Sequence, residues 1–204
     1  VRGRAIRVTT TTDQTQTRPA DLVRREFKAL RPDALWVVDL AYVATWRGFA
    51  YVAVVIDVFS RLNVRWRVLA SLKTDIALDA LEQALHARRP GDALIHHSDR
   101  GSQYLAIRYT DRLREAGVAS SVGSVGDSYD NALAESIIGL FKTEVIRRLG
   151  PWRSVDDVEL ATLEWVAWFN HSRLLEPLGY RTPSEFETMY HQQHTAPAEV
   201  AGLT

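Results

Sequence analysis

The sequence has no cysteine and a single methionine among its 204 residues. The absence of cysteine excludes disulfide bonds and metal sites built on thiolates, and it fits a reducing cytosol. Long apolar runs are missing as well. None approaches the roughly 20 residues that a membrane-spanning helix needs, and the first residues do not form a signal peptide. We therefore expect a globular protein without a membrane partner.

An excess of one charge is also absent, since 25 Lys and Arg balance 25 Asp and Glu. A net charge of zero excludes a strongly basic nucleic-acid binder of the histone type. The charge is nevertheless uneven, because residues 1–31 are mainly basic and residues 154–204 mainly acidic. Residues 1–20 include the polar run VTTTTDQTQT, which has nothing to bury, and we expect a disordered basic tail there. A basic arm that meets phosphates is the alternative.

Hydrophobic periodicity predicts a mixed α/β domain. The expected strands cover residues 35–43, 49–59, 62–70, 93–99 and 118–122. The expected helices cover residues 21–30, 74–89, 103–117, 130–149 and 154–171, and TPSE at 182–185 begins another. Short connections favour an antiparallel meander of the first three strands, with helices covering the sheet.

One carboxylate interrupts the first apolar strand, LWVVDLAYV, at Asp39. A buried charge costs free energy unless it is paired or binds a metal, so Asp39 needs a partner. Asp99 ends the fourth strand, where a capping or turn role is the alternative to a functional site. Glu135 and Lys142 lie in line on one helix, about 10 Å apart. This face of the helix could bind a metal and a phosphate, and the alternative is an ordinary solvent-exposed face.

Four blocks of sequence, in this order, carry a resemblance to a known family: WVVDLAYV, HHSDRGSQY, YDNALAESIIGLFKTE and WFNHSRLLEPLGYRTPSEFE. They resemble the catalytic core of bacterial insertion-sequence transposases of the OrfB type, which carry a DDE motif and share a superfamily with retroviral integrases. The resemblance covers about residues 20–187 and includes the separation of 35 between Asp99 and Glu135. It implies an RNase H-like fold with a mixed five-stranded sheet flanked by helices.

The resemblance implies that Asp39, Asp99 and Glu135 are both the catalytic residues and the metal ligands. Three carboxylates without cysteine suit Mg²⁺ or Mn²⁺, with two ions during catalysis. The implied activity is DNA nicking followed by strand transfer. Because like charges repel, we expect Glu135 to be loosely placed until metal binds. The alternatives are an RNase H-like nuclease that only hydrolyses, and a catalytically silent fragment that binds DNA or inhibits the transposase.

The expected DNA contacts are Lys142, Arg100 and Asn131, with helix capping an equal alternative for Asn131. The expected partners are the transposon ends, target DNA and further copies of the chain in a transpososome. A helix-turn-helix partner or upstream domain, which we do not find in this sequence, is also expected. The resemblance further implies a bacterial protein of the cytoplasm, associated with the nucleoid.

We expect four regions along the chain: a tail at 1–20, a short helical lead-in at 21–34, the integrase catalytic core at 35–172 and a C-terminal extension at 173–204. The six tryptophans are expected mainly in the core, although exposed aromatic rings would suit base stacking.

Several other residues have plain structural interpretations. His96 and His97 are neighbours on a strand, so they point to opposite faces and do not easily bind one ion together. Asp57 is expected in a turn or a salt bridge. The family usually has a histidine near Leu174 or Leu175, and its absence here bears on DNA contacts rather than on metal binding.

Overall fold

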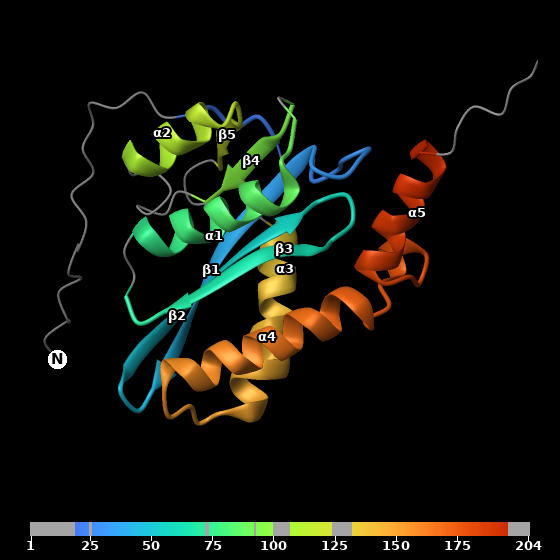
Figure 1. Cartoon of the computed structure of the whole chain (residues 1–204). Helices are drawn as coiled ribbons and strands as arrows, with labels where there is room; N and C mark the ends of the chain where they lie inside the picture. The colour runs from blue at the N-terminus through green and yellow to red at the C-terminus, as the bar shows by residue number, and fades with distance from the viewer. Residues whose placement is uncertain are drawn as a thin grey trace, which may run out of the picture.

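The structure is a computed structural model that describes residues 19–24, 26–71, 74–91, 93–99, 107–123 and 132–195. Most of the tail expected at residues 1–20 lies outside these ranges. Figure 1 shows a sheet with helices packed against it and the last helix, α5, at one end of the molecule. Within the described ranges, no helix is both long enough and apolar enough to cross a membrane.

Five strands form one mixed sheet in the order β3-β2-β1-β4-β5. The strands are β1 (Leu35–Thr45), β2 (Gly48–Asp57), β3 (Asn63–Leu69), β4 (Ile95–Ser98) and β5 (Ala119–Val122). The first three pair antiparallel, which confirms the predicted meander, because their short turns leave no room for a crossover. The strand β4 pairs parallel with β1 on one side and with β5 on the other.

Different helices cover the two faces of the sheet. Helices α1 (Thr74–Arg88) and α2 (Ile107–Glu115) bury one set of alternate β1 side chains. Helices α3 (Ala132–Phe141) and α4 (Val155–His171), with the π-helical segment η1 (Lys142–Arg147) between them, bury the other set. The short helix η2 (Glu176–Leu178) and α5 (Pro183–Thr195) follow. This three-layer arrangement is the expected RNase H-like fold.

The helical lead-in predicted at 21–34 is wrong, since the described residues of this segment form turns, bends and irregular chain. Asp21 Oδ1 accepts hydrogen bonds from the backbone N–H groups of Val23 and Arg24, at 2.9 and 3.0 Å. Arg24 also has a left-handed φ of 50°. A side chain that bonds to nearby backbone competes with helix formation, and here it starts a turn that lets Val23 and Phe27 pack separately on the core.

The long helix predicted from 130 to 149 is confirmed from Ala132 onward, but it widens into a π-helix at Lys142. The next helix begins with the capping box that the sequence predicted. Asp157 N–H donates to Ser154 Oγ at 3.2 Å, and Ser154 N–H donates to Asp157 Oδ2 at 3.1 Å. These reciprocal bonds fix where α4 starts and so define its packing against β3.

A buried ionic network attaches α5 to the domain. Two guanidinium nitrogens of Arg88 donate to the Glu187 carboxylate, with Nη2 3.0 Å from Oε2. Ser60 Oγ lies 2.7 Å from Glu187 Oε2 and 2.8 Å from Asp57 Oδ1. Asp57 also accepts backbone N–H groups of Ser60 and Asp33, each at 2.8 Å. The predicted turn role of Asp57 is confirmed, and burial raises its pKa to about 6.

Candidate active site

Asp39 lies in the middle of β1, the central strand of the sheet, and is half-buried. It shares its face of the strand with Val37 and Ala41, which pack in the core beneath α3. The backbone N–H of Leu40 donates to Asp39 Oδ1 at 2.7 Å. The strand therefore directs this carboxylate toward the layer formed by α3 and η1.

Asp99 follows the last residue of β4 and is exposed. The parallel pairing of β1 with β4 ends at Val38 opposite Ser98, so Asp39 and Asp99 come next on adjacent strands. Neighbouring strands are about 4.8 Å apart, and residues at one register of a parallel pair point to the same face. The pairing thus brings the two aspartates together at the end of β4.

Glu135 and Lys142 come from the helix that packs on β1. Ala134, Ile137 and Ile138 are buried against the sheet, whereas Glu135 is exposed in the first turn of α3. Lys142 is half-buried at the first position of η1, two α-helical turns beyond Glu135. The apolar side of this helix therefore packs on the sheet, while Glu135 on α3 and Lys142 on η1 lie outside that packed side.

The pKa of Asp39 is raised to about 6, first of all because burial penalises its charged form. The hydrogen bond from Leu40 N–H lowers it, as does the charge of Lys142. The charges of Asp99 and Glu135 raise it. All three charged side chains are thus near enough to act electrostatically on Asp39, although they come from two other segments of the chain.

The donor set fits a hard divalent cation, because carboxylate oxygens are the ligands that Mg²⁺ and Mn²⁺ prefer. A carboxylate buried with other acids near it gains most from a cation, since the cation offsets both the burial and the repulsion. In the described part of the chain, however, no three His, Asp or Glu side chains stand close enough to enclose one ion. The acids therefore face one space without forming a closed ligand shell.

Two of the expected DNA contacts, Arg100 and Asn131, lie outside the described residues. Tyr42 was not singled out from the sequence, yet it lies three residues beyond Asp39 and is 53% exposed. Burial raises its pKa, and so do the charges of Asp99, Tyr51 and Asp39. From the sequence, an aromatic residue in an apolar strand is expected to be buried. Only the structure shows that Tyr42 is exposed and near the acids.

The adjacent histidines point to opposite faces, as predicted, and both are buried. His96 Nε2 lies 3.1 Å from the hydroxyl of Tyr109 on the α2 side, and burial lowers the pKa of His96 to about 3. His97 Nδ1 lies 2.8 Å from Ser121 Oγ, with Phe27 edge-on to its ring. These contacts show that both histidines pack within the core.

The tryptophans divide into two groups. Trp36, Trp152 and Trp165 are buried, and Trp66 packs partly buried against the core, as expected. A core position is wrong for the other two, because Trp46 is 68% and Trp168 46% exposed. Each of these two has an arginine over its ring: Arg153 lies 5.5 Å from the Trp46 centroid, and Arg173 lies 5.3 Å from that of Trp168.

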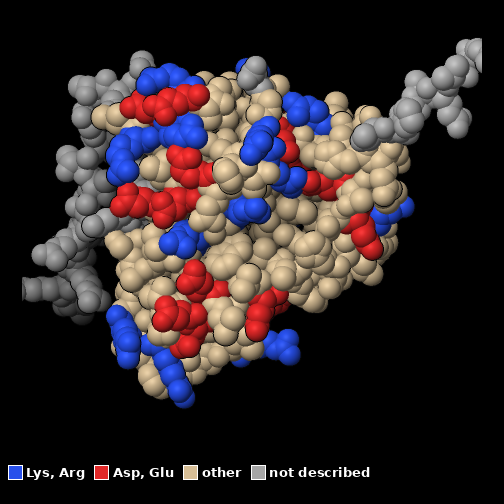
Figure 2. All heavy atoms as spheres, viewed as in Figure 1, with Lys and Arg blue, Asp and Glu red and all other residues tan. Residues whose placement is uncertain are grey.

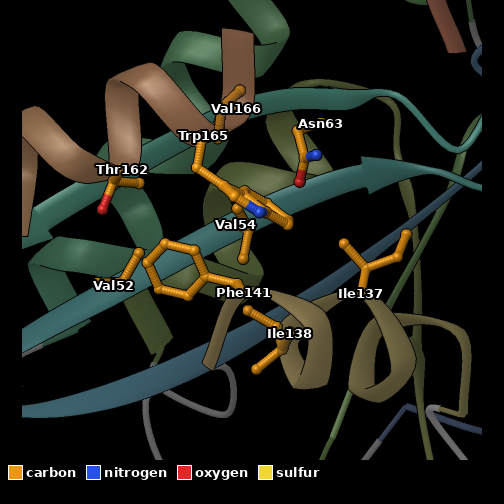
Figure 3. A pocket seen from close by; sticks show the side chains of 9 residues that line it. All are labelled: Val52, Val54, Asn63, Ile137, Ile138, Phe141, Thr162, Trp165 and Val166. Carbon is orange, nitrogen blue, oxygen red and sulfur yellow. The ribbon is translucent and has the colours of Figure 1, made fainter. Parts of the chain in front are cut away.

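The hollow shown in Figure 3 lies between the sheet, α3 and α4 and is a packing feature of the core rather than the site. Its lining is apolar apart from Asn63 and Thr162. Thr162 Oγ1 donates to the Val158 carbonyl at 2.6 Å, whereas Asn63 Oδ1 and Nδ2 are buried without a hydrogen-bond partner among the described residues. Carboxylates are absent from its lining, so the candidate active site is the separate space beside Asp39 at the end of β4.

Comparison with known proteins agrees with the resemblance seen in the sequence. A family described as integrase core domain matches residues 29–128, and a second of the same description matches residues 116–183. The putative transposase for insertion sequence element IS986/IS6110 of Mycobacterium tuberculosis is 54% identical over 202 residues. That alignment spans 97% of this chain and 72% of the relative.

Two solved structures share the fold at low sequence identity. The HTLV-2 integrase catalytic core domain in complex with magnesium has a TM-score of 0.61 and 15% identity, covering 78% of this chain and 99% of that one. A subunit of the simian T-cell lymphotropic virus intasome in complex with PP2A regulatory subunit B56 gamma has a TM-score of 0.66 and 16% identity. That match covers 86% of this chain and 60% of the viral one. The folded domain and the sequence relative point to one family, and the chain belongs to the insertion-sequence transposases of the integrase superfamily.

Proposed function

We propose that this chain carries the catalytic core of a metal-dependent transposase that nicks DNA and joins the freed 3′ end to target DNA. The observation that supports it best is the common register of Asp39 and Asp99, with Glu135 near enough to raise the Asp39 pKa. Acids gathered in this way repel one another and destabilise the fold unless a cation binds. A purely structural role therefore explains the three carboxylates poorly.

The proposed ligands of the cations are Asp39, Asp99 and Glu135. Their oxygen atoms favour Mg²⁺ or Mn²⁺ over zinc, and the HTLV-2 core with the same fold is described in complex with magnesium. Two such cations, held by these carboxylates, would supply Lewis acidity that lowers the pKa of the attacking oxygen and stabilises the leaving oxygen at phosphorus. We infer that Glu135 closes onto the aspartates only when a cation is present.

The chain's own residues position the DNA and determine the charge around the reacting phosphate. Asp39 holds a proton below about pH 6 and must lose it before it can bind a cation. Lys142 lies near Asp39 and supplies a positive charge that suits a phosphate next to the reacting bond. Arg100 and Asn131 remain proposed contacts to the same DNA.

The proposed partners are the transposon ends, the target DNA and further copies of this chain. The viral relative with this fold is described as part of an intasome, which supports action in an assembly. Sequence-specific recognition of the ends is assigned to a helix-turn-helix segment or partner, because a chain with no net charge relies on local basic residues that contact phosphates and do not read the base sequence. The bacterial cytoplasm, at the nucleoid, is the proposed place of action.

A nuclease that only hydrolyses DNA is the second candidate function, because the same carboxylates serve hydrolysis and strand transfer. Supercoiled plasmid with Mg²⁺ tests for nicking, and an oligonucleotide with a free 3′ end tests for joining. We expect both products from the wild-type chain. Nicks without joined products on any end sequence would favour the nuclease.

Three variants test the site: Asp39→Asn, Asp99→Asn and Glu135→Gln. Each should lower nicking by about a thousandfold or more, since loss of metal-held charge stabilisation costs several kcal/mol at the transition state. Glu82→Gln is the matched control, because Glu82 is an acid on α1 that is paired with Arg112. Retained activity in any one of the three variants would mean that the triad is wrongly assigned. Inactivity of the wild type together with DNA binding would favour the silent fragment.

A further inference from the structure

The closed end of the β1–β2 hairpin carries exposed aromatic and basic side chains. Trp46 and Arg47 form the turn, and the guanidinium carbon of Arg153 lies 5.5 Å from the centre of the Trp46 ring. The backbone N–H of Trp46 donates to the Trp152 carbonyl at 2.9 Å, and Thr45 forms a β-bridge with Trp152. We call Trp46, Arg47 and Arg153 the hairpin platform. Its parts come from distant segments but are held together by backbone hydrogen bonds.

The platform lies in line with the candidate active site. From Asp39, β1 continues to Thr45, so Trp46 is about 23 Å from Asp39 at the usual rise per residue. The helix formed by α3 and η1 packs on β1, and the chain that follows this helix bridges back to the hairpin end at Trp152. The strand and the helix therefore connect the acids to the platform along one side of the molecule.

Basic residues follow the same path. Lys142 lies near Asp39, and Arg147 ends the π-helical segment. In an α-helix these two would be about 140° apart, whereas hydrogen bonds from i to i+5 bring residues five apart to nearly the same side. Among the described residues, Arg47, Arg147 and Arg153 form no ion pair, so their charges are available to a ligand. The widened helix thus extends a positive track from the site toward the platform.

Acidic residues limit this track on one side. Figure 2 shows Lys and Arg side chains at the lower end of the molecule, where Figure 1 places the hairpin, and acidic side chains above them. Helix α4 begins next to the platform with Asp156 and Asp157. A polyanion is attracted to the arginines and repelled by the first turn of α4, so it is confined to the η1 side.

We propose that the hairpin platform binds the DNA duplex whose end reacts at Asp39, Asp99 and Glu135. A separation of about 23 Å corresponds to about seven base pairs from the reacting end, at 3.4 Å per base pair. Arg47 and Arg153 contact backbone phosphates, and the Trp46 ring holds the Arg153 guanidinium in place and packs on the sugar. The position along the duplex rests on the proposed function, because the triad defines which end is counted.

Duplex binding measured by fluorescence anisotropy, without metal, tests the platform independently of catalysis. The probes are one long duplex with native phosphates and two with neutral methylphosphonates, placed either six to nine or fourteen to seventeen base pairs from the end. We expect the nearer neutral patch to weaken wild-type binding about tenfold. In the double variant Arg47→Ala/Arg153→Ala the nearer patch should have no further effect, and the salt slope should fall by about two. Trp46→Ala should lose part of the sensitivity to the nearer patch, and Trp46→Phe should retain most of that sensitivity.

The matched control is Arg108→Ala/Arg114→Ala, which removes two exposed charges from α2 on the other face of the sheet. An equal loss of affinity in both double variants would overturn the platform, and so would equal sensitivity of the wild type to the two neutral patches. Unfolding temperatures of all variants establish that the fold is intact. If the nicking assay fails while the nearer patch still matters, the catalytic assignment is wrong and the DNA contact stands.

Discussion

Asp39 and Asp99 stand side by side because β1 and β4, which are far apart in sequence, pair in a parallel register that ends at Val38 and Ser98. The pKa of Asp39 rises to about 6 mainly through burial, and the nearby charge of Asp99 adds a smaller contribution. Like charges held together in this way favour either a shared proton or a bound cation. This relationship has consequences for stability, for metal binding and for the role of Lys142.

The substitution Asp39→Asn should stabilise the fold above pH 6. Because the folded pKa of about 6 exceeds the unfolded value of 3.8, the protonated form is favoured in the folded state, and that stability is lost as the pH rises through about 6. We expect a gain of about 2–3 kcal/mol at pH 8 that disappears near pH 4. Urea unfolding at several pH values measures it. Asp111→Asn, at a half-buried position on α2 on the other face of the sheet, makes the same chemical change away from Asp39 and is the control.

Magnesium should stabilise the wild-type chain more at pH 7.5 than at pH 5. Below its pKa Asp39 is protonated, and the cation must displace that proton, so the apparent affinity falls as the pH falls through about 6. A cation present at about 100 times its dissociation constant should add about 2.7 kcal/mol to the free energy of unfolding. Thermal unfolding with and without Mg²⁺ measures the effect. Equal stabilisation of Asp99→Asn by Mg²⁺ would contradict a site that contains Asp99.

Removal of the positive charge in Lys142→Ala should raise the pKa of Asp39 further, because that charge now lowers it. The pH at which Mg²⁺ begins to stabilise the chain should move upward by the same amount. Carboxyl carbon chemical shifts of labelled aspartate, followed by pH titration, report the change directly. Lys28→Ala removes an exposed lysine of the lead-in segment and should leave the titration unchanged. A downward shift in Lys142→Ala would mean that Lys142 lies elsewhere in solution.

Arg88→Ala should destabilise the protein by about 3 kcal/mol or more, because it leaves the carboxylate of Glu187 buried without its partner. The matched control is Arg112→Ala. Arg112 Nε lies 2.5 Å from Glu82 Oε1, but both of these side chains are partly exposed, so its loss should cost less than about 1 kcal/mol. Urea unfolding of the two variants measures the difference. Similar costs for both would show that α5 does not depend on the buried network.

Asn63→Leu should stabilise the protein by about 1–2 kcal/mol, since it replaces two unsatisfied polar atoms in an apolar hollow. Asn170→Leu should do the opposite. Asn170 Oδ1 accepts the Asn63 N–H at 2.9 Å, and its Nδ2 donates to the Asn63 carbonyl at 3.0 Å. The two variants exchange the same residue types in one region. A loss of stability in Asn63→Leu would indicate a bound water on that side chain.

The local sequence determined most of the secondary structure and the identity of the candidate site residues. Strand-like apolar runs joined by short connections predicted the three-stranded meander, and Ser154 with Asp157 predicted the start of α4. These features depend on neighbours in the chain, so a short window contains their physical cause. The prediction of a helical lead-in at 21–34 was wrong for a reason that is also local, because the turn formed by Asp21 competes with a helix there.

Only the tertiary structure decided which residues meet. The pairing of β1 with β4 sets the register of Asp39 and Asp99, and packing of α3 on β1 brings Glu135 near them. The backbone contact between Trp46 and Trp152 leaves the Trp46 ring at the surface, against the expectation of a core position. Strand register and helix packing are chosen by the fit of segments remote in sequence. Sequence therefore supplied the acids, and long-range packing brought them near one another at the candidate site.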